Sequence, residues 1–192
     1  MKRMTGLWRS GLAALLLWCA WPALAAELPS LSLADAKAKQ AVILDTRPSY
    51  FYQGWPMAGE TQGGHVAGAE HLSAEWKYSD EEWPKALASK GLKADLPVAL
   101  YGAPREVAEV ARLLRQQGIK QLFELQGWQS APREHLARWQ QLVYPLWLAD
   151  LQAGKPVAAA PKGEWEVLEV DWGAPKAYLL SHIPGAGYID TN

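Results

Sequence analysis

Hydrophobic and polar positions alternate along the chain in a way that predicts short buried strands separated by helices. Apolar runs at residues 41–44 and 97–101 are typical of buried strands, and residues 119–125 predict a further strand. Between Glu106 and Gln117, apolar residues recur at i, i+3, i+4 and i+7, which predicts an amphipathic helix. This alternation predicts an α/β fold, a parallel sheet with helices on both faces.

Other segments have weaker signals. Ser32 is a candidate N-cap for a short helix through Ala38, and an acidic cluster after Ser79 predicts a helix to about residue 89. Residues 48–64 have no helical period and predict a loop. A helix is expected over residues 139–152, kinked or split at Pro145. Residues 153–164 have linker composition, and residues 165–170 predict a new strand.

The first 26 residues have the pattern of a cleavable export signal. Lys2, Arg3 and Arg9 precede an apolar run over residues 11–21, and "ALA" at residues 23–25 is a small-x-small cleavage signature. The apolar run is too short to span a bilayer. We therefore expect cleavage after Ala25 or Ala26, a periplasmic location and no membrane anchor after cleavage.

Cleavage would change the composition of the protein. The only cysteine, Cys19, lies within the predicted signal, so the mature chain would have neither a disulfide nor a thiolate nucleophile. Loss of the three basic residues of this segment shifts the formal net charge from −1 to −4. Mild acidity argues against nucleic acid or an anionic membrane as partner.

The chain contains two copies of one opening pattern. An apolar strand with an acidic end, at residues 42–45 and again at residues 167–171, is followed by a loop and then by "GHVAGA" (64–69) or "SHIPGA" (181–186). The matched positions are His65 with His182, Gly68 with Gly185, and Ala69 with Ala186. The order of these features indicates tandem domains.

Only the opening of the second copy is present, so residues 165–192 are too short to bury both faces of a sheet. We expect a first domain over residues 27–138, a connecting helix and linker over 139–164, and an incomplete second domain over 165–192. On this interpretation the chain is a fragment.

The ordered motifs resemble the rhodanese family of sulfurtransferases. "LDTR" (44–47), "GHVAGA" (64–69) and "LQGWQ" (125–129) match the family order, and "SHIPGA" matches its second copy. The resemblance implies a rhodanese-like fold, no cofactor and no metal. It also implies transfer of a sulfane sulfur from a donor such as thiosulfate, through a cysteine persulfide, to a thiophilic acceptor.

The chain departs from the family where the reactive cysteine is expected. That place reads Gly102-Ala103-Pro104-Arg105, a loop shorter than the family's cradle of backbone amides, in which Pro104 removes one N–H donor. No residue here is predicted to be catalytic. Arg105 could be a remnant anion site, but a solvated first-turn residue is the favoured interpretation.

The other motif residues are expected to be mainly structural. Asp45 and Arg47 could orient a substrate, although a salt bridge or loop cap at a strand end is favoured. His65, His71, His135 and His182 have no metal-ligand spacing, so hydrogen-bonded structural roles are favoured. Trp55, Trp76 and Trp128 are predicted in the core. Trp139 and Trp147 are candidate interface residues, because aromatic residues exposed on this helix would need a neighbouring domain to cover them.

Two functions remain open from the sequence. The chain could be the N-terminal scaffold of an exported multi-repeat sulfurtransferase, with later repeats as its partners and its cysteine outside this chain. Alternatively, it could be a catalytically silent rhodanese module that acts as a periplasmic binding protein.

Overall fold

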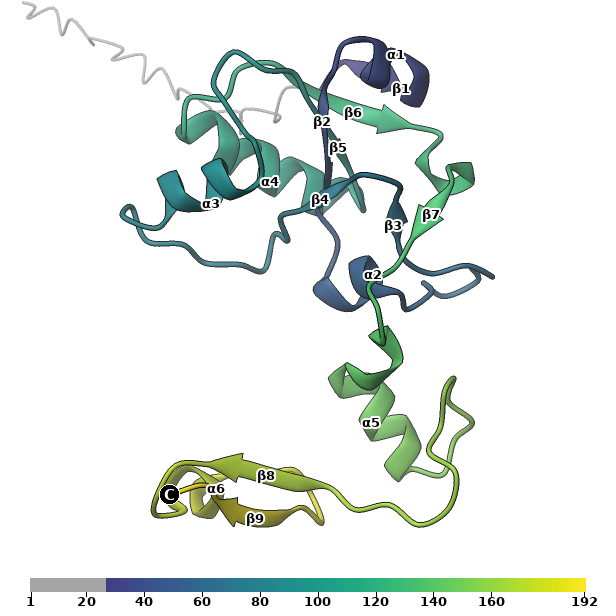
Figure 1. The fold of residues 1–192 in the computed structure, drawn as a ribbon, viewed down its shortest axis with the longest axis vertical. Helices are drawn as coiled ribbons and strands as arrows, with labels where there is room; N and C mark the ends of the chain where they lie inside the picture. The colour runs from purple at the N-terminus through teal and green to yellow at the C-terminus, as the bar shows by residue number, and fades with distance from the viewer. Residues whose placement is uncertain (1–26) are drawn as a thin grey trace, which may run out of the picture.

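A five-stranded parallel sheet forms the centre of the protein. The computed structural model describes residues 27–192, so the predicted export signal and its cleavage site lie outside the described residues. The strands run in the order β1-β6-β5-β2-β4 (Figure 1). Their bounds are β1 Ser30–Ser32, β2 Val42–Asp45, β4 Glu70–His71, β5 Val98–Tyr101 and β6 Leu122–Gln126. The predicted parallel sheet is confirmed.

Helices cover both faces of this sheet, as predicted. One face packs against α3 (Trp83–Ser89) and α4 (Pro104–Gln116), and the other packs against α1 (Leu33–Ala38). Side chains of β5 alternate between the faces: Val98 and Leu100 enter the α3/α4 core, whereas Ala99 and Tyr101 enter the opposite core. Strands buried on both faces explain why β5 reads as a continuous apolar run.

Several predicted boundaries were wrong. The helix expected from residue 79 begins at Trp83, because Ser79–Glu82 form a turn in which Glu82 accepts a hydrogen bond from the Ser79 amide. Residues 48–64 contain a short helix, α2 (Ser49–Gln53), that has no helical period in its sequence. Strand β1 was not predicted, since it is an edge strand of three residues beside β6.

The segment that follows β6 differs more from the prediction. It begins with a short 3-10 turn, η1 (Trp128–Ser130), and the strand β7 (Arg133–Glu134). Strand β7 pairs in antiparallel with β3 (His65–Val66), which lies earlier in the chain. The helix expected over residues 139–152 is divided into a 3-10 turn, η2 (Trp139–Gln141), and α5 (Pro145–Gln152). Pro145 starts the second helix because its missing N–H costs nothing at a first turn.

Five aromatic side chains connect α5 to the first unit, and we call them the aromatic joint: Tyr50, Trp55, Trp139, Tyr144 and Trp147. Trp55 is fully buried, its ring lies 4.8 Å from Trp139 and 6.0 Å from Trp147, and its Nε1 donates to the Leu142 carbonyl oxygen at 2.9 Å. Trp147 is buried, so the cover expected from a neighbouring domain is provided by the first unit of the same chain.

The C-terminal unit consists of β8 (Leu168–Asp171), α6 (Lys176–Leu180) and β9 (Gly187–Asp190), with β8 and β9 parallel. The strand predicted at residues 165–170 thus starts later, at Leu168. No helix within residues 27–192 has the length and apolar character needed to cross a bilayer.

The register of the strands refines the internal repeat. Leu44 pairs with Glu70 in the first copy, and Leu168 pairs with Gly187 in the second. Since Ala69 matches Ala186, the residue equivalent to Asp45 is Glu169. The acidic end assumed from the sequence, Asp171, corresponds instead to Arg47, so the second copy lacks that arginine.

Candidate functional site

The candidate site lies at the carboxyl ends of β2 and β5, where the central strands meet a loop and the start of α4. Asp45 and Arg47 are both fully buried there and form an ion pair of 2.7 Å. Arg47 Nε also donates to Asp45 Oδ1 at 3.0 Å, and its Nη2 donates to the Gly64 carbonyl oxygen at 2.8 Å. Burial disfavours the charged guanidinium, but the hydrogen bonds and charge of Asp45 raise the pKa of Arg47 above its usual value.

Tyr101, at the end of β5, connects this ion pair to the backbone of the "GHVAGA" segment (64–69). Its hydroxyl donates to Asp45 Oδ2 at 2.8 Å and accepts from the Val66 amide at 2.9 Å. Burial, followed by the charge of Asp45, raises the pKa of Tyr101 far above its usual value, so the phenol stays protonated. The carboxylate of Asp45 is therefore saturated by protein donors.

The loop after β5 has no room for a side chain at Gly102. A Cβ atom built there would overlap Thr46 Oγ1 and would lie 3.0 Å from Glu106 Oε2. The φ of this glycine is 154°, which side-chain-bearing residues rarely adopt. Thr46 cannot easily move, since its hydroxyl donates to the Tyr101 carbonyl oxygen at 3.0 Å.

The amino end of α4 already carries an anion from its own sequence. Glu106 Oε2 accepts a hydrogen bond from the Ala103 amide at 2.9 Å, in the position of a helix capping carboxylate. Burial raises the pKa of Glu106, although the bond from Ala103 lowers it. Pro104 supplies no amide, so the N–H groups available at this helix start are few.

Arg105 lies exposed on the first turn of α4. It lines a groove of about 1190 Å³ that carries charges of both signs. The charged side chains of this groove are Glu75, Lys77, Arg105, Glu106, Glu109, Arg112 and Arg115. Arg112 is paired with Glu109 at 2.8 Å. With acidic and basic side chains mixed along it, the groove has the charge pattern of a solvated helix face.

The predicted motif histidines have structural contacts. His65 Nδ1 donates to the Tyr52 carbonyl oxygen at 2.7 Å, and His71 Nε2 donates to the Arg47 carbonyl oxygen at 2.9 Å. The Tyr52 ring lies between the two imidazoles, with centroid distances of 3.9 and 4.5 Å. Within residues 27–192, no three His, Cys, Asp or Glu residues gather as a metal site would require.

The second copy repeats this turn almost bond for bond. Tyr52 Oη donates to the Ala69 carbonyl oxygen at 3.0 Å, and Tyr178 Oη donates to that of Ala186 at 2.7 Å. His182 Nδ1 donates to the Tyr178 carbonyl oxygen at 3.0 Å, and the two rings stack at 4.2 Å. Gly68 and Gly185 have φ angles of 76° and 77°, which favour glycine in both turns.

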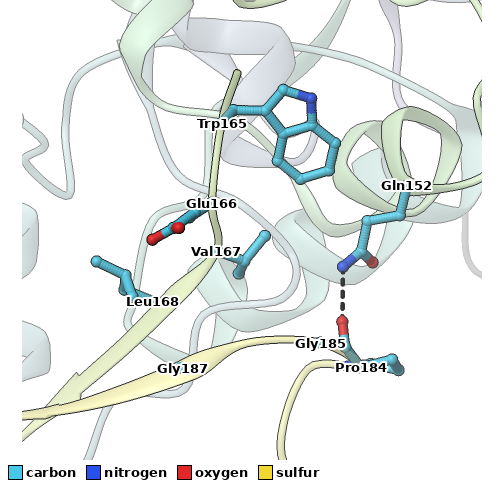
Figure 2. Close-up of a pocket in the computed structure, with 8 residues that line it drawn as sticks. All are labelled: Gln152, Trp165, Glu166, Val167, Leu168, Pro184, Gly185 and Gly187. Carbon is cyan, nitrogen blue, oxygen red and sulfur yellow. Dashed lines mark hydrogen bonds between the residues drawn. The ribbon is translucent and has the colours of Figure 1, made fainter.

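A second hollow lies between α5 and the C-terminal strands. Figure 2 shows Gln152 donating to the carbonyl oxygen of Pro184, a bond of 2.8 Å, with Trp165 beside it. The hollow has a volume of about 690 Å³ and is lined by Gln152, Trp165, Glu166, Val167, Leu168, Pro184, Gly185 and Gly187. Its lining includes no histidine, lysine or arginine, and Glu166 is its only titratable side chain.

Residues 30–130 match the rhodanese-like domain family. The chain belongs to the rhodanese-like family. It is 44% identical over 197 residues to the thiosulfate sulfurtransferase YnjE of Escherichia coli (strain K12), a match that covers 100% of this chain and 44% of that protein. The chain thus spans less than half the length of this curated relative.

Solved structures of rhodanese-like proteins have the same fold. The crystal structure of YnjE matches with a TM-score of 0.77 at 44% identity, covering 86% of this chain and 41% of that one. A structure of EanB in complex with hercynine matches with a TM-score of 0.75 at 27% identity, covering 87% and 42%. These matches agree with the parallel sheet and its helices on both faces.

Sequence reasoning identified Asp45, Arg47, His65 and Gly102 but missed the residues that complete the site. Tyr101 read as the last member of an apolar strand, and no local sequence signal placed it beside the Asp45 carboxylate. Glu106, three residues after Ala103, could have been recognised as a capping carboxylate. Tyr52 lay in a segment predicted to be a loop.

Proposed function

We propose that residues 27–192 form the scaffold of an exported rhodanese-type sulfurtransferase and do not carry sulfur themselves. The observation that carries the proposal is the filled loop at the end of β5. Gly102 has no space for a side chain, and Glu106 occupies the amide at the start of α4. A cysteine persulfide at this position would need room for its side chain and free backbone N–H groups to bind its negative charge.

The reaction requires a thiolate that this part of the chain lacks. A cysteine thiolate attacks the outer sulfur of thiosulfate and sulfite leaves. The resulting persulfide then passes that sulfur to a thiophilic acceptor and regenerates the thiolate. The only cysteine is Cys19, in the predicted export signal. The nucleophile would therefore belong to a further repeat of the protein, outside this chain.

The proposed organisation follows the expected division of the chain. Residues 27–138 would be a non-catalytic first domain, 139–164 its connection, and 165–192 the start of a second domain that packs with later repeats. Similarity to YnjE over the whole chain supports this arrangement. From the predicted export signal at residues 1–26, we further propose that the protein is periplasmic, and from the family resemblance that it uses no metal or cofactor.

A sulfur-transfer assay tests the scaffold proposal. Purified residues 27–192, incubated with thiosulfate and cyanide, should form no thiocyanate above the uncatalysed rate, while full-length YnjE serves as the positive control. Thiocyanate production by a homogeneous preparation would contradict the proposal, because it would require sulfur transfer without a cysteine.

The Gly102→Cys variant tests whether the loop geometry, and not the missing thiol alone, prevents the reaction. We expect no thiocyanate from this variant and a loss of about 1–2 kcal/mol in the free energy of unfolding, because the position combines a positive φ with a crowded Cβ. Gly102→Ala is the matched control and should lose the same stability. A folded, active Gly102→Cys protein would show that the cradle is intact.

Export is tested by expressing all 192 residues in a Gram-negative host. The protein should be recovered from the periplasmic fraction with a mass that corresponds to cleavage after Ala25 or Ala26. Recovery of uncleaved protein from the cytoplasm would contradict this part of the proposal.

A further inference from the structure

Met57 carries the only sulfur atom of residues 27–192, since the other methionines and the single cysteine precede residue 27. Its side chain is half-buried against the core on the α1 face of the sheet, so small molecules can reach part of it. A turn fixes its backbone: the Met57 amide donates to Glu60 Oε2 at 3.2 Å, and the Glu60 amide donates to the Met57 carbonyl oxygen at 3.0 Å. The sulfur therefore has a defined place in the loop that follows α2.

This sulfur faces a buried cation. Arg47 Nη1 donates to Met57 Sδ at 3.5 Å, which is the only hydrogen bond of Nη1 within the described part of the chain. The Nε and Nη2 atoms of the same guanidinium bind the Asp45 carboxylate, and Nη2 also binds the Gly64 carbonyl oxygen. A thioether is a weak acceptor, and the Arg47 side chain is only 1% exposed. Nη1 is thus the weakly bonded end of a cation that is otherwise well bonded.

Aromatic rings surround the guanidinium on other sides. Its carbon lies 5.1 Å from the ring centre of Trp128, 5.4 Å from that of Tyr101 and 6.0 Å from that of Phe51. The faces of these rings attract a cation but provide no lone pair of the strength of an oxygen acceptor. A stronger acceptor for Nη1 would therefore have to come from the position of Met57.

We propose that Met57 is a reversible oxidation site whose sulfoxide oxygen accepts a hydrogen bond from Arg47 Nη1. Hydrogen peroxide would supply the oxygen. The sulfur lone pair forms an S–O bond with one peroxide oxygen, the O–O bond breaks, and the departing hydroxide takes the proton of the transferred oxygen and leaves as water. The sulfur is oxidised and the peroxide is reduced by the same electron pair. Methionine sulfoxide reductases, one for each sulfoxide epimer, restore the thioether.

The expected effect on the fold is opposite to the usual one. Oxidation commonly disrupts packing, because it turns an apolar side chain into a polar one. At Met57 it would replace a weak acceptor with a strong one beside a buried cation and so form a charge-assisted hydrogen bond. The unbranched methionine side chain can move outward enough to place the oxygen between the sulfur and Nη1. Oxidation would then tighten the contact between this loop and the Asp45–Arg47 ion pair, a role separate from sulfur transfer.

Peroxide treatment of purified residues 27–192 tests the proposal. Peptide mass spectrometry should find one added oxygen atom on Met57 while the protein remains folded. We expect the Nη protons of Arg47 to exchange with solvent about tenfold more slowly after oxidation, measured by NMR on protein with isotope-labelled arginine, and the urea midpoint to rise. Met57→Leu contains no sulfur and should change in neither respect. Resistance of folded Met57 to peroxide, unchanged exchange at Arg47 or a lower urea midpoint would each overturn the proposal.

Two substitutions test the same contact without an oxidant. Met57→Gln offers a side-chain carbonyl oxygen to Arg47 Nη1, whereas Met57→Leu keeps an apolar side chain of similar size and offers no acceptor. We expect the higher urea midpoint for Met57→Gln, because Met57→Leu leaves a buried donor without a partner. The reverse order would show that Met57 acts only through apolar packing. The thiocyanate assay does not involve Met57, so either proposal can fail without the other.

Discussion

At the scale of single residues, the candidate site is closed by contacts within the chain. Asp45 accepts from Arg47 and Tyr101, and Arg47 also donates to Gly64. The guanidinium carbon of Arg47 lies 5.1 Å from the centre of the Trp128 ring. This buried ion pair holds the ends of β2 and β5 together, and both oxygens of the Asp45 carboxylate already accept hydrogen bonds from the protein.

Removing one partner of this pair should be costly. Asp45→Asn leaves the Arg47 guanidinium buried without its counter-charge, and we expect the free energy of unfolding to fall by about 3–5 kcal/mol in urea titrations. Glu109→Gln breaks a solvent-exposed pair with Arg112 and should cost less than about 1 kcal/mol. Equal effects of the two variants would contradict the structural role given to Asp45.

Residue types identified from motifs were the easiest features to predict. Asp45 and Arg47 were expected to form a salt bridge at a strand end, and the structure contains that pair. The involvement of Tyr101 and Trp128 could not be predicted, because their contacts join β2 to segments more than fifty residues away. Such contacts are set by the packing of the strands and have no local sequence signal.

At the scale of elements, the turn that contains the repeated motif is built around a histidine–tyrosine–histidine stack. Tyr52, from α2, lies between His65 of β3 and His71 of β4. Burial lowers the pKa of His71, in spite of its hydrogen bond to the Arg47 carbonyl oxygen. His71 therefore couples the stability of this turn to pH.

The sign of this pH effect follows from the direction of the shift. The unfolded chain binds a proton at His71 near its ordinary pKa of about 6.5, above the pKa of the folded protein. The stabilisation that comes from burying neutral His71 should be complete above a pH of about 6.5. It should decline as the pH falls toward the folded pKa, by at most about 1.4 kcal/mol per pH unit.

Urea titrations between pH 7.5 and 5 measure this effect. His71→Gln keeps an N–H donor for Arg47 and should flatten the decline, whereas His135→Gln, at an exposed histidine, should leave it unchanged. The same pH dependence in all three proteins would show that His71 is not its source.

Element types were predicted better than element boundaries. The strands β2 and β5 stand out as short apolar runs, and the helix α4 stands out because it is long and strongly periodic. Helices α2 and α6 have five residues each, and their position depends on tyrosine contacts across the turn. Short elements of this kind have too few residues for a periodic pattern, so tertiary contacts decide them.

At the scale of the whole molecule, the aromatic joint determines how the connection leaves the first unit. Tyr50 stacks on Tyr144 at 4.4 Å, and a Cβ at Gly54 would overlap the Trp139 ring. Trp147 Nε1 donates to the Ala158 carbonyl oxygen at 2.8 Å, which extends the ordered contacts into the segment predicted as a linker. The connection is therefore held by specific contacts at both ends of α5.

Trp139→Ala should weaken this attachment. We expect a loss of about 2–3 kcal/mol in the free energy of unfolding, because a half-buried indole and its edge-on contact with Trp55 are removed. Limited proteolysis should also cut residues 139–164 faster. Trp165→Ala, outside the joint, is the control and should change neither result by much. Unchanged proteolysis of Trp139→Ala would contradict a fixed connection.

The organisation of the whole chain was the feature that the sequence predicted least completely. The repeat itself was visible in two motifs, but its alignment at the strand end was wrong by two residues, since acidic residues occur at both Glu169 and Asp171. The aromatic surface of residues 139–152 was expected to need an outside partner. A linear pattern shows that such a surface exists, but it does not show that the surface folds back on Trp55.

The different spans of the strand pairs also imply an order of folding as the chain is made. Ser30 pairs with Glu124, so β1 cannot join the first sheet until almost the whole first unit has emerged. In contrast, Glu169 pairs with Tyr188, and the hydrogen bonds that join the second turn to Tyr178 and Glu169 close within one short segment. Because local contacts form before distant ones, the turn of the second copy can form as soon as its own residues have emerged, without waiting for a distant strand.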